Sequence, residues 1–320
     1  MKSAVQVHPN VYAIACPFDG AGLVQCYYVM GAKRALIDTG VSTTPDEDLE
    51  PALRAVGLAL SDVDFIINTH GHMDHLGGNH RAKEVSNAQI LIHEIDAPFT
   101  RDPRLNVTSA TTVPELVRRG RREDLLPNVE ANVLRMVGKS AGVDRELRDG
   151  DRVDLGNDVV LSVIHTPGHT AGSCTFYWEK ERLALSGDSI QVRGSRAGIL
   201  PLYFLAREYM ASQRRLLDLP IDLLCMGHNF NGSAASNAPI RRGGEAHATI
   251  REALAVAETI DRVVKSQHAA DPDADVLTIA PHVLNELSYS LPILRDRADH
   301  ASVPHRSLAP IIAHLEAARA

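Results

Sequence analysis

"FIINTHGHMDHLGGNH", residues 65–80, runs from an apolar strand into a Gly-Gly turn and carries four histidines and one aspartate. Its centre spells H-x-H-x-D-H, with His70, His72, Asp74 and His75 at the fixed positions. Imidazoles and carboxylates are side chains that zinc binds readily in proteins. A strand end that delivers so many of them predicts a metal site, whereas the alternative is a polar loop in which the histidines are incidental.

Three stretches farther along the chain each add one residue of the same kind. "HTPGHT" (165–170) supplies His169, "ALSGDS" (184–189) supplies Asp188, and "LLCMGHN" (223–229) supplies His228, each after an apolar strand. Loops at strand ends of an α/β sheet can converge on one edge. Seven such groups are too many for one tetrahedral ion and suit two ions that share a carboxylate, with room for a bridging water. Zinc is the expected metal, and iron or manganese are the alternatives.

The order of predicted elements indicates an α/β fold with two additions. Strands alternate with helices through residues 1–240, including helices predicted at 43–58 and from about 77 to 85. The part from about 97 to 149 reads as helices that are polar on one side, which predicts a helical insertion. From residue 241 to 320 the pattern is helical throughout, and we expect an appendage that caps the active site.

Composition excludes several classes of protein. Of 320 residues 44% are hydrophobic, and the net charge is −7 without any clustered basic segment, which argues against nucleic-acid or membrane partners. No run of eighteen apolar residues and no export signal is evident, so we expect a cytoplasmic protein. The four cysteines form no CxxC pair, so we expect them to be reduced and mostly buried; a disulfide between Cys16 and Cys26 is the alternative.

"LIDTG" (36–40) completes five landmarks that occur in order between about residues 5 and 232. With them the sequence resembles the metallo-β-lactamase superfamily, whose fold is a four-layer αββα sandwich. The resemblance implies that Asp38 hydrogen-bonds a ligand histidine and fixes its tautomer. The ligand sets that it implies are His70, His72 and His169 for the first metal, Asp74, His75 and His228 for the second, and Asp188 bridging the two.

The chemistry expected of such a site is hydrolysis by a metal-bridging hydroxide. Two divalent ions lower the pKa of a bridging water towards about 7, so that hydroxide is available at neutral pH. Asp74 is expected to be the catalytic residue, because it can both ligate and orient the hydroxide and then carry a proton to the leaving group. We expect neither a G-x-S-x-G nucleophile elbow nor a catalytic Cys–His pair, and Cys225 is more typical of a core residue.

The substrate is narrowed to a class by the same resemblance. Classical lactamases of the family often carry Cys where Asp188 stands, whereas Asp is similar to glyoxalase II, acyl-homoserine lactonases and thioesterases. The lactonases commonly have Tyr at the position of Gln191, and "PHRSLAPIIAHL" (304–315) is a poor match to a glutathione-binding motif. We therefore expect a dinuclear zinc hydrolase of a small acyl thioester, ester or lactone. The alternatives are a mononuclear-iron sulfur dioxygenase and an amide or lactam hydrolase.

"GILPLYFLAREYM" (198–210) is the candidate substrate wall. It offers Leu200, Leu202, Tyr203 and Phe204, although an ordinary buried helix start would have the same pattern. Gln191 is a further candidate pocket residue, and Arg193 and Arg196 are candidates to bind an anionic group, with solvated loop charges as the alternative. A small-molecule acyl substrate is the expected partner, and the exposed appended helices suggest a homodimer.

Overall fold

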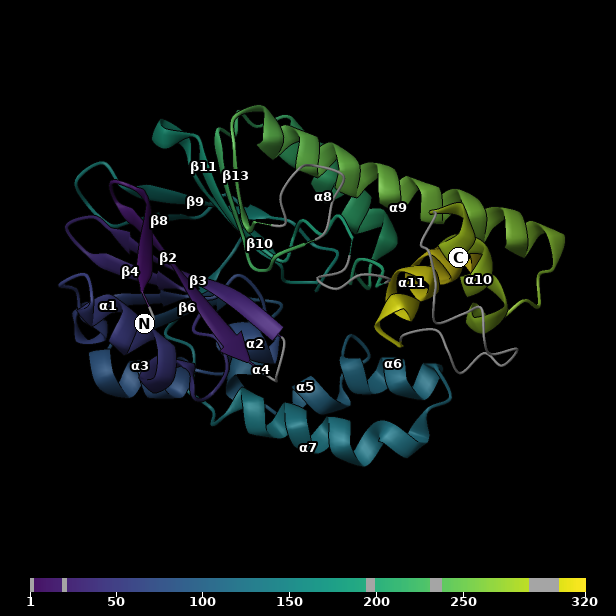
Figure 1. The fold of residues 1–320 in the computed structure, drawn as a ribbon, viewed down its shortest axis with the longest axis horizontal. Helices are drawn as coiled ribbons and strands as arrows, with labels where there is room; N and C mark the ends of the chain where they lie inside the picture. The colour runs from purple at the N-terminus through teal and green to yellow at the C-terminus, as the bar shows by residue number, and fades with distance from the viewer. Residues whose placement is uncertain (1–2, 19–21, 194–198, 231–237, 288–304) are drawn as a thin grey trace.

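The computed structural model describes residues 3–18, 22–193, 199–230, 238–287 and 305–320, in which two β-sheets face each other between helices (Figure 1). The first sheet contains, in spatial order, β1 (Ala4–His8), β2 (Val11–Phe18), β3 (Gly22–Met30), β4 (Arg34–Ile37), β5 (Phe65–Ile67), β6 (Gln89–His93) and β7 (Arg145–Leu147). The second contains β13 (Ile240–Arg242), β12 (Leu223–Met226), β11 (Leu183–Gly187), β10 (Cys174–Trp178), β9 (Val160–His165) and β8 (Arg152–Asp154). The αββα arrangement confirms the predicted sandwich.

Both sheets change direction in a way that gathers loops at one edge. In the first sheet β1 to β4 pair antiparallel, and β4, β5, β6 and β7 then pair parallel to one another. In the second sheet β11 and β12 are the parallel pair. Carboxyl ends of parallel strands open at the same edge of a sheet. The loops after β4, β5 and β6 therefore lie next to one another.

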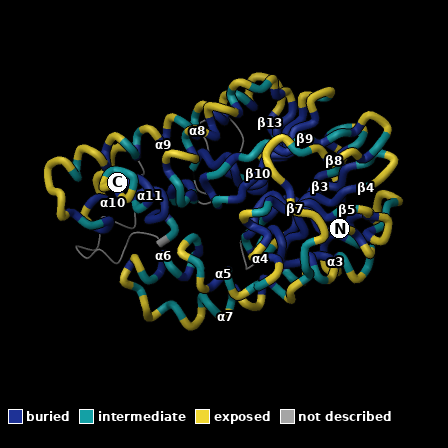
Figure 2. Tube along the Cα trace, turned by 180° about the vertical axis from the view of Figure 1, so that it is seen from behind, coloured by how far each residue is buried: buried dark blue, intermediate teal, exposed yellow. Residues whose placement is uncertain are grey.

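Apolar side chains from nearly every strand fill the space between the sheets. Ile37, Ile67, Leu161, Phe176 and Leu185 belong to this core and are at most 1% exposed. The strands β10 and β11 are buried along their whole length, since helices cover their outer face. Figure 2 shows the strands largely buried and the exposed residues gathered on outer helices and turns.

Helices form the two outer layers. The first sheet is covered by α1 (Glu50–Arg54) and α3 (Asn79–Ser86), and the second by α8 (Ala206–Leu217) and the first half of α9 (Gly244–Ala270). The short helix α2 (Met73–Leu76) begins at the end of the β5 loop. The sandwich thus leaves the loop edge open, and the remaining helices lie around that edge.

The predicted insertion is helical over most of its length. It contains α4 (Ala97–Arg101), α5 (Leu105–Thr108), α6 (Val113–Arg119) and α7 (Leu126–Val137). Its end belongs to the sandwich instead, because 145–147 forms β7 and pairs with β6. Only a three-residue strand is involved, too short for its periodicity to be recognised in the sequence.

The C-terminal part packs α9, α10 (Val276–Glu286) and α11 (Leu308–Arg319) around an apolar centre. The helix α9 belongs to both parts: Ile250 packs against the second sheet, whereas Ile260 packs against α10 and α11. A domain boundary at residue 240 stays a prediction. Two ion pairs, Arg119–Glu316 (3.1 Å) and Arg121–Asp275 (2.8 Å), join the insertion to the C-terminal helices, which face α6 in Figure 1.

Two predicted helices are present but differ in detail. Within the segment 43–58, a π-helical stretch at Pro45–Leu49 continues directly into the short α1, because Pro51 cannot donate the hydrogen bond that a regular α-helix needs. The helix predicted from about residue 77 begins at Asn79. A Cβ on Gly77 would lie 2.3 Å from the Met136 carbonyl oxygen, so this position serves the close approach of α7.

The cysteines are as expected. Cys16, Cys26, Cys174 and Cys225 are all free and buried, so the alternative of a Cys16–Cys26 disulfide is wrong. Burial raises the pKa of the Cys225 thiol to about 12, which keeps it protonated and suits a core residue.

None of the described helices combines the length with the apolar character that crossing a bilayer requires.

Candidate metal centre

The seven candidate ligands converge at the open edge of the sandwich. The loop after β5 and the start of α2 carry four of them, and the loops after β9, β11 and β12 carry one each. Ligating atoms that lie within 4.8 Å of one another form three groups among them, one of which, His70, His75 and Asp188, overlaps the other two. We call His70, His72 and His169 the three-histidine group, and Asp74, His75 and His228 the mixed group.

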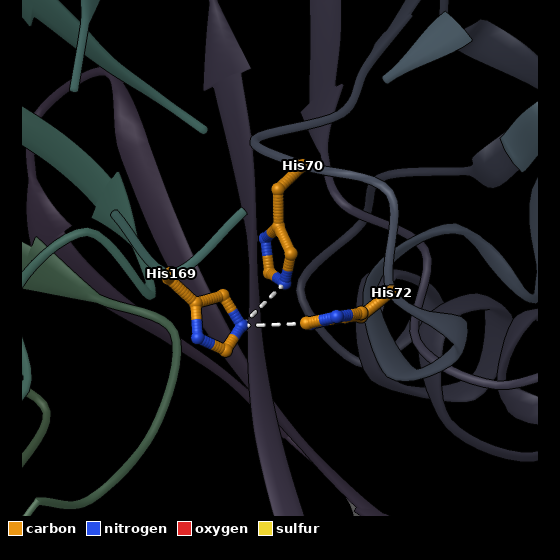
Figure 3. Close-up of side chains that lie close together, drawn as sticks. All are labelled: His70, His72 and His169. Carbon is orange, nitrogen blue, oxygen red and sulfur yellow. Dashed lines mark hydrogen bonds between the residues drawn. The ribbon is translucent and has the colours of Figure 1, made fainter. Parts of the chain in front are cut away.

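The imidazoles of the three-histidine group point toward one another (Figure 3). His169 Nε2 lies 3.1 Å from His70 Nε2 and 2.7 Å from His72 Nδ1. His70 and His169 are buried, and His72 is half-buried. Three ring nitrogens therefore surround one point.

The mixed group lies beside it, and Asp188 lies between the two. His228 Nε2 is 3.3 Å from both Asp74 Oδ2 and His75 Nε2. Asp188 Oδ2 is 3.6 Å from His169 Nε2 and 3.4 Å from His228 Nε2, and its Oδ1 is 3.4 Å from His75 Nε2. This Oδ1 is buried and has no hydrogen-bond partner among the described residues. The carboxylate thus faces both groups.

Each of the five histidines has a hydrogen-bond acceptor at the ring nitrogen that faces away from the cluster. The pairs are His72 Nε2 with Thr111 O (3.0 Å), His169 Nδ1 with Leu202 O (2.5 Å), His228 Nδ1 with Leu23 O (2.5 Å), His75 Nδ1 with Asp38 Oδ2 (2.8 Å), and His70 Nδ1 with Thr69 Oγ1 (3.1 Å). Thr69 Oγ1 can accept, because it donates its own proton to Asp38. With a proton on each outer nitrogen, every neutral ring presents a lone pair inward.

Lone pairs that face one another at about 3 Å repel unless a cation lies between them. The unpartnered Oδ1 of Asp188 has the same need, since a buried carboxylate oxygen without a partner is costly. Imidazole nitrogens and carboxylate oxygens are also the donor atoms that zinc, iron and manganese bind. The residues present therefore fit two divalent cations with Asp188 between them.

Electrostatics differ between the two groups. Burial, followed by the neighbouring histidines, lowers the pKa of His70 and His169, so these rings stay neutral. Burial acts in the same direction on His75, but the Asp38 and Asp188 carboxylates outweigh it and raise its pKa to about 10. The mixed group therefore favours a positive charge, which a proton on His75 supplies in the metal-free protein and a bound cation would supply in its place.

Asp38 follows β4 and lies beneath the cluster. It adopts φ 61°, a left-handed conformation that is uncommon for a residue other than glycine. Its Oδ1 accepts from the Thr69 main chain (2.8 Å), and its Oδ2 accepts from Thr69 Oγ1 and from His75, at 2.8 Å each. The expected hydrogen bond to a candidate ligand histidine is present.

Asp96 has a comparable place that was not predicted from the sequence. It follows β6, is 1% exposed, and accepts from Gly71 N (2.8 Å), Thr170 Oγ1 (2.6 Å) and Gly172 N (2.9 Å). It thus joins the loop of the first two histidines to the loop of His169. The signal that could have revealed it is its position, because it is one more carboxylate after a strand of the same parallel set.

A cavity of about 470 Å³ adjoins the cluster. The sandwich, the insertion and the C-terminal part all contribute to its walls. Its mostly apolar lining includes Phe18, Leu23, Met73, Val113, Val129, Val133, Met136, Ile199, Leu200, Leu202, Phe204 and Phe230. Apart from the histidines, the only cationic side chain among the described lining residues is that of Arg306.

The predicted pocket residues divide into two sets. Gln191, Leu202 and Phe204 line the cavity, as does Leu200, whereas Tyr203 does not: it is fully buried and packs on Tyr209. Leu202 and Phe204 thus face the cavity, whereas the Tyr203 side chain between them is directed away from it.

Arg193 is also absent from the cavity wall. Its Nε lies 3.9 Å from a carboxylate oxygen of Glu252 on α9, so its charge faces an acid of the outer layer. The structure thus places Tyr203 and Arg193 outside the described lining of this cavity, and their role as pocket residues stays a prediction. Arg196 lies outside the described residues.

Known proteins share both the sequence pattern and the fold. The family model of the metallo-β-lactamase superfamily matches residues 19–228, which include all seven candidate ligands. An acyl-coenzyme A thioesterase, MBLAC2 of Gallus gallus, is 28% identical over 216 residues, covering 63% of this chain and 69% of its own. An atrochrysone carboxyl ACP thioesterase of Emericella nidulans is 24% identical over 261 residues (81% and 67%). The human persulfide dioxygenase ETHE1 is 23% identical over 220 residues (67% and 68%).

Solved structures extend the likeness to the C-terminal helices. A metallo-β-lactamase family protein of Thermus thermophilus superposes with a TM-score of 0.71 at 22% identity and covers 98% of this chain and 94% of its own. A β-lactamase domain protein of Burkholderia ambifaria gives a TM-score of 0.66 at 18% identity, with coverages of 98% and 87%. At this identity the likeness concerns the fold. Because the family match spans well over half of its residues, the chain belongs to the metallo-β-lactamase superfamily.

Proposed function

We propose that the protein is a dinuclear zinc hydrolase that cleaves a small acyl thioester, ester or lactone. The observation that carries this proposal is the convergence of seven side chains, with their lone pairs directed inward, beside a mostly apolar cavity. The three-histidine group would hold one ion, the mixed group the other, and Asp188 both. Two such ions would supply hydroxide at neutral pH and polarise the carbonyl of the substrate.

Asp74 is the residue that we assign to proton transfer. It lines the cavity, and its Oδ2 lies 3.3 Å from His228 Nε2. Hydrogen bonding to His228 and the charge of His75 outweigh burial and hold the pKa of this carboxyl well below its usual range. As an ionised carboxylate, Asp74 can accept a proton from the attacking water and deliver it to the leaving group.

The cavity supports a small acyl compound as substrate. Aliphatic and aromatic side chains such as Val133, Met136 and Phe204 would contact the acyl chain and exclude water from the carbonyl. Arg306 adds one cation to these walls, so the acyl group or the leaving group would be amphipathic rather than wholly apolar. Two relatives named as thioesterases, of acyl-coenzyme A and of an acyl carrier protein, favour the thioester within this class.

The test compares a medium-chain acyl-CoA thioester with an acyl lactone of matched length. Zinc-loaded protein would be assayed beside a chelated sample, with bound zinc counted per chain. Preferential release of thiol with two zinc ions bound is the expected result, and preference for the lactone would place the protein with the lactonases. No hydrolysis of either compound would contradict the proposed substrate class.

A second candidate function is a sulfur dioxygenase with one iron. The similarity to the human persulfide dioxygenase favours it, and the three-histidine group with Asp188 would suffice to hold one ion. Against it, all three side chains of the mixed group are also in place. One iron per chain together with oxygen uptake on a persulfide would favour the dioxygenase over the hydrolase.

A further inference from the structure

A chain of hydrogen bonds connects the C-terminal helices to the segment 199–205, which lines the cavity. Asp261 on α9 accepts from His314 Nδ1 on α11 (3.1 Å), and Tyr203 OH lies 2.9 Å from His314 Nε2. Because Asp261 takes the proton on Nδ1, Nε2 carries the lone pair and Tyr203 is the donor. Tyr203 and His314 are both fully buried.

The same segment is bound to the candidate metal centre through Gln191. Its Oε1 accepts from Leu202 N (2.7 Å), and its Nε2 donates to Asp188 Oδ2 (3.2 Å). The main chain of Gln191 is fixed by Tyr209, whose hydroxyl donates to Gln191 O (2.8 Å) and accepts from Gln191 N (3.0 Å). The ring of Tyr209 stacks on Tyr203, with centroids 4.1 Å apart and planes at 11°.

Leu202 therefore stands between two sets of contacts. Its carbonyl accepts from His169 Nδ1 (2.5 Å), which directs Nε2 of this ring to the centre of the three-histidine group. One residue later, Tyr203 is held by α11. The next main-chain N–H, that of Phe204, donates to Gly168 O (2.8 Å), beside His169. A displacement of this short segment would move the acceptor that orients His169.

We infer that the C-terminal helices complete the metal centre, with His314 as a positioning residue that acts through Tyr203 and the Leu202 carbonyl on His169. This inference rests on the proposed function only in that the cluster binds divalent metal. The acceptor of a metal-ligating histidine fixes its tautomer and ring orientation, and its loss typically lowers metal affinity 10–100-fold. Because Tyr203 acts one step farther away, we expect an effect near the lower end of that range.

The experiment compares two tyrosine variants that each lose one buried hydroxyl. Tyr203→Phe keeps the stacked ring but removes the bond to His314. Tyr177→Phe is the matched control, because Tyr177 is 4% exposed and donates to Pro220 O (2.8 Å) on the far side of β10 from the cluster. For both, zinc affinity would be measured by competition with a chromophoric chelator, and the visible spectrum of the cobalt-substituted protein would report the ligand geometry.

The expected result for Tyr203→Phe is an increase of about tenfold in the Kd of the more affected zinc site, with a changed cobalt spectrum. Tyr177→Phe should keep both readouts at their wild-type values even where its thermal stability falls. His314→Gln, which retains a polar side chain of similar length, serves as the second variant and should shift both readouts in the same direction.

Wild-type affinity and spectrum in Tyr203→Phe and His314→Gln would overturn the inference, as would an equal loss in Tyr177→Phe. Wild-type protein that binds no divalent metal would overturn the proposed function as well. Tight metal binding with neither thioester nor lactone hydrolysis would contradict the proposed substrate class alone and leave the positioning role standing.

Discussion

The two groups of candidate ligands differ in what holds them. The mixed group is supported from within the sandwich: Asp38 follows β4, and Leu23 is the second residue of β3. In the three-histidine group, His70 is supported by Thr69 next to β5, whereas His72 and His169 depend on segments outside the sheets. Thr111 of the insertion accepts from His72, and Leu202 of the cavity wall accepts from His169. Both groups present imidazole nitrogens inward, and the mixed group adds a carboxylate oxygen. The mixed group is supported by the first sheet, whereas the three-histidine group is completed by its surroundings.

This difference indicates which parts of the chain can change substrate specificity. A change in the insertion or in the C-terminal helices reaches the three-histidine group through main-chain carbonyls, while the mixed group keeps its support in the sheet. The same added segments contribute to the walls of the cavity, together with the sandwich. The parts of the chain that select a substrate would thus also adjust one of the two metal positions, and separate disturbance of each group tests this.

The largest effect is expected from Asp74→Asn. The amide cannot take a proton from the attacking water, so turnover should fall by about 10²–10⁴-fold, the range for removal of a general acid–base. Steady-state kinetics of the zinc-loaded variant would measure it, with metal counted per chain. Near-normal turnover with two metals bound would refute the assignment of Asp74.

Asp38→Asn should disturb the mixed group more than the three-histidine group. The carboxylate accepts three hydrogen bonds, two from Thr69 and one from His75, and an amide offers a single oxygen for them. Zinc affinity of the mixed group should fall 10–100-fold. The three-histidine group should lose less, because Asp38 reaches His70 only through Thr69 Oγ1.

Stepwise zinc titration of Asp38→Asn would separate the two sites. Asp158→Asn is a suitable control, because it makes the same substitution at a side chain that is 78% exposed and pairs with Lys180. An equal loss of affinity at both groups would argue against separate supports.

Asp96→Asn is the counterpart on the other side and should act on the three-histidine group. The carboxylate joins the Gly71 and Thr170 loops, so its loss loosens His70, His72 and His169 relative to one another. We expect an affinity loss of about tenfold there and a stability loss of about 1.5–3 kcal/mol from the hydrogen bonds to a buried charge. Chemical denaturation and zinc competition measure the two effects. If only the mixed group lost zinc affinity, the assignment of Asp96 to the three-histidine group would be wrong.

The sequence predicted the ligands better than their supports, for a physical reason. His70, His72 and Asp74 lie within one short motif after an apolar strand, and strand ends of a parallel set meet at one edge. Asp96 has the same kind of position, but it stands alone and no neighbouring residue marks it.

Main-chain carbonyls that accept hydrogen bonds from the candidate ligand histidines are even harder to recognise in the sequence. Any residue at Thr111 or Leu202 offers the same carbonyl oxygen, so residue type carries no signal. The direction of Tyr203 depends on the extended backbone of its segment and on His314, which lies 111 residues away along the chain. Contacts of this kind appear only in three dimensions.

The smallest expected effect is the pH dependence of stability that His314 contributes, and it concerns only the C-terminal helices. Burial lowers the pKa of His314 to about 4, although Asp261 opposes the shift and Lys265 supports it. In the unfolded chain the pKa is about 6.5, so between about pH 6.5 and 4 the unfolded state binds more protons and stability falls as the pH falls. From pH 8 to pH 6 this histidine should remove about 1 kcal/mol from the free energy of unfolding of the metal-free protein.

Urea denaturation of wild type and His314→Gln at the two pH values measures the difference, which the variant should lack. A pH dependence identical in both proteins would mean that His314 is not held neutral by the C-terminal helices, and the structural separation of the two groups would then lose its support on the C-terminal side.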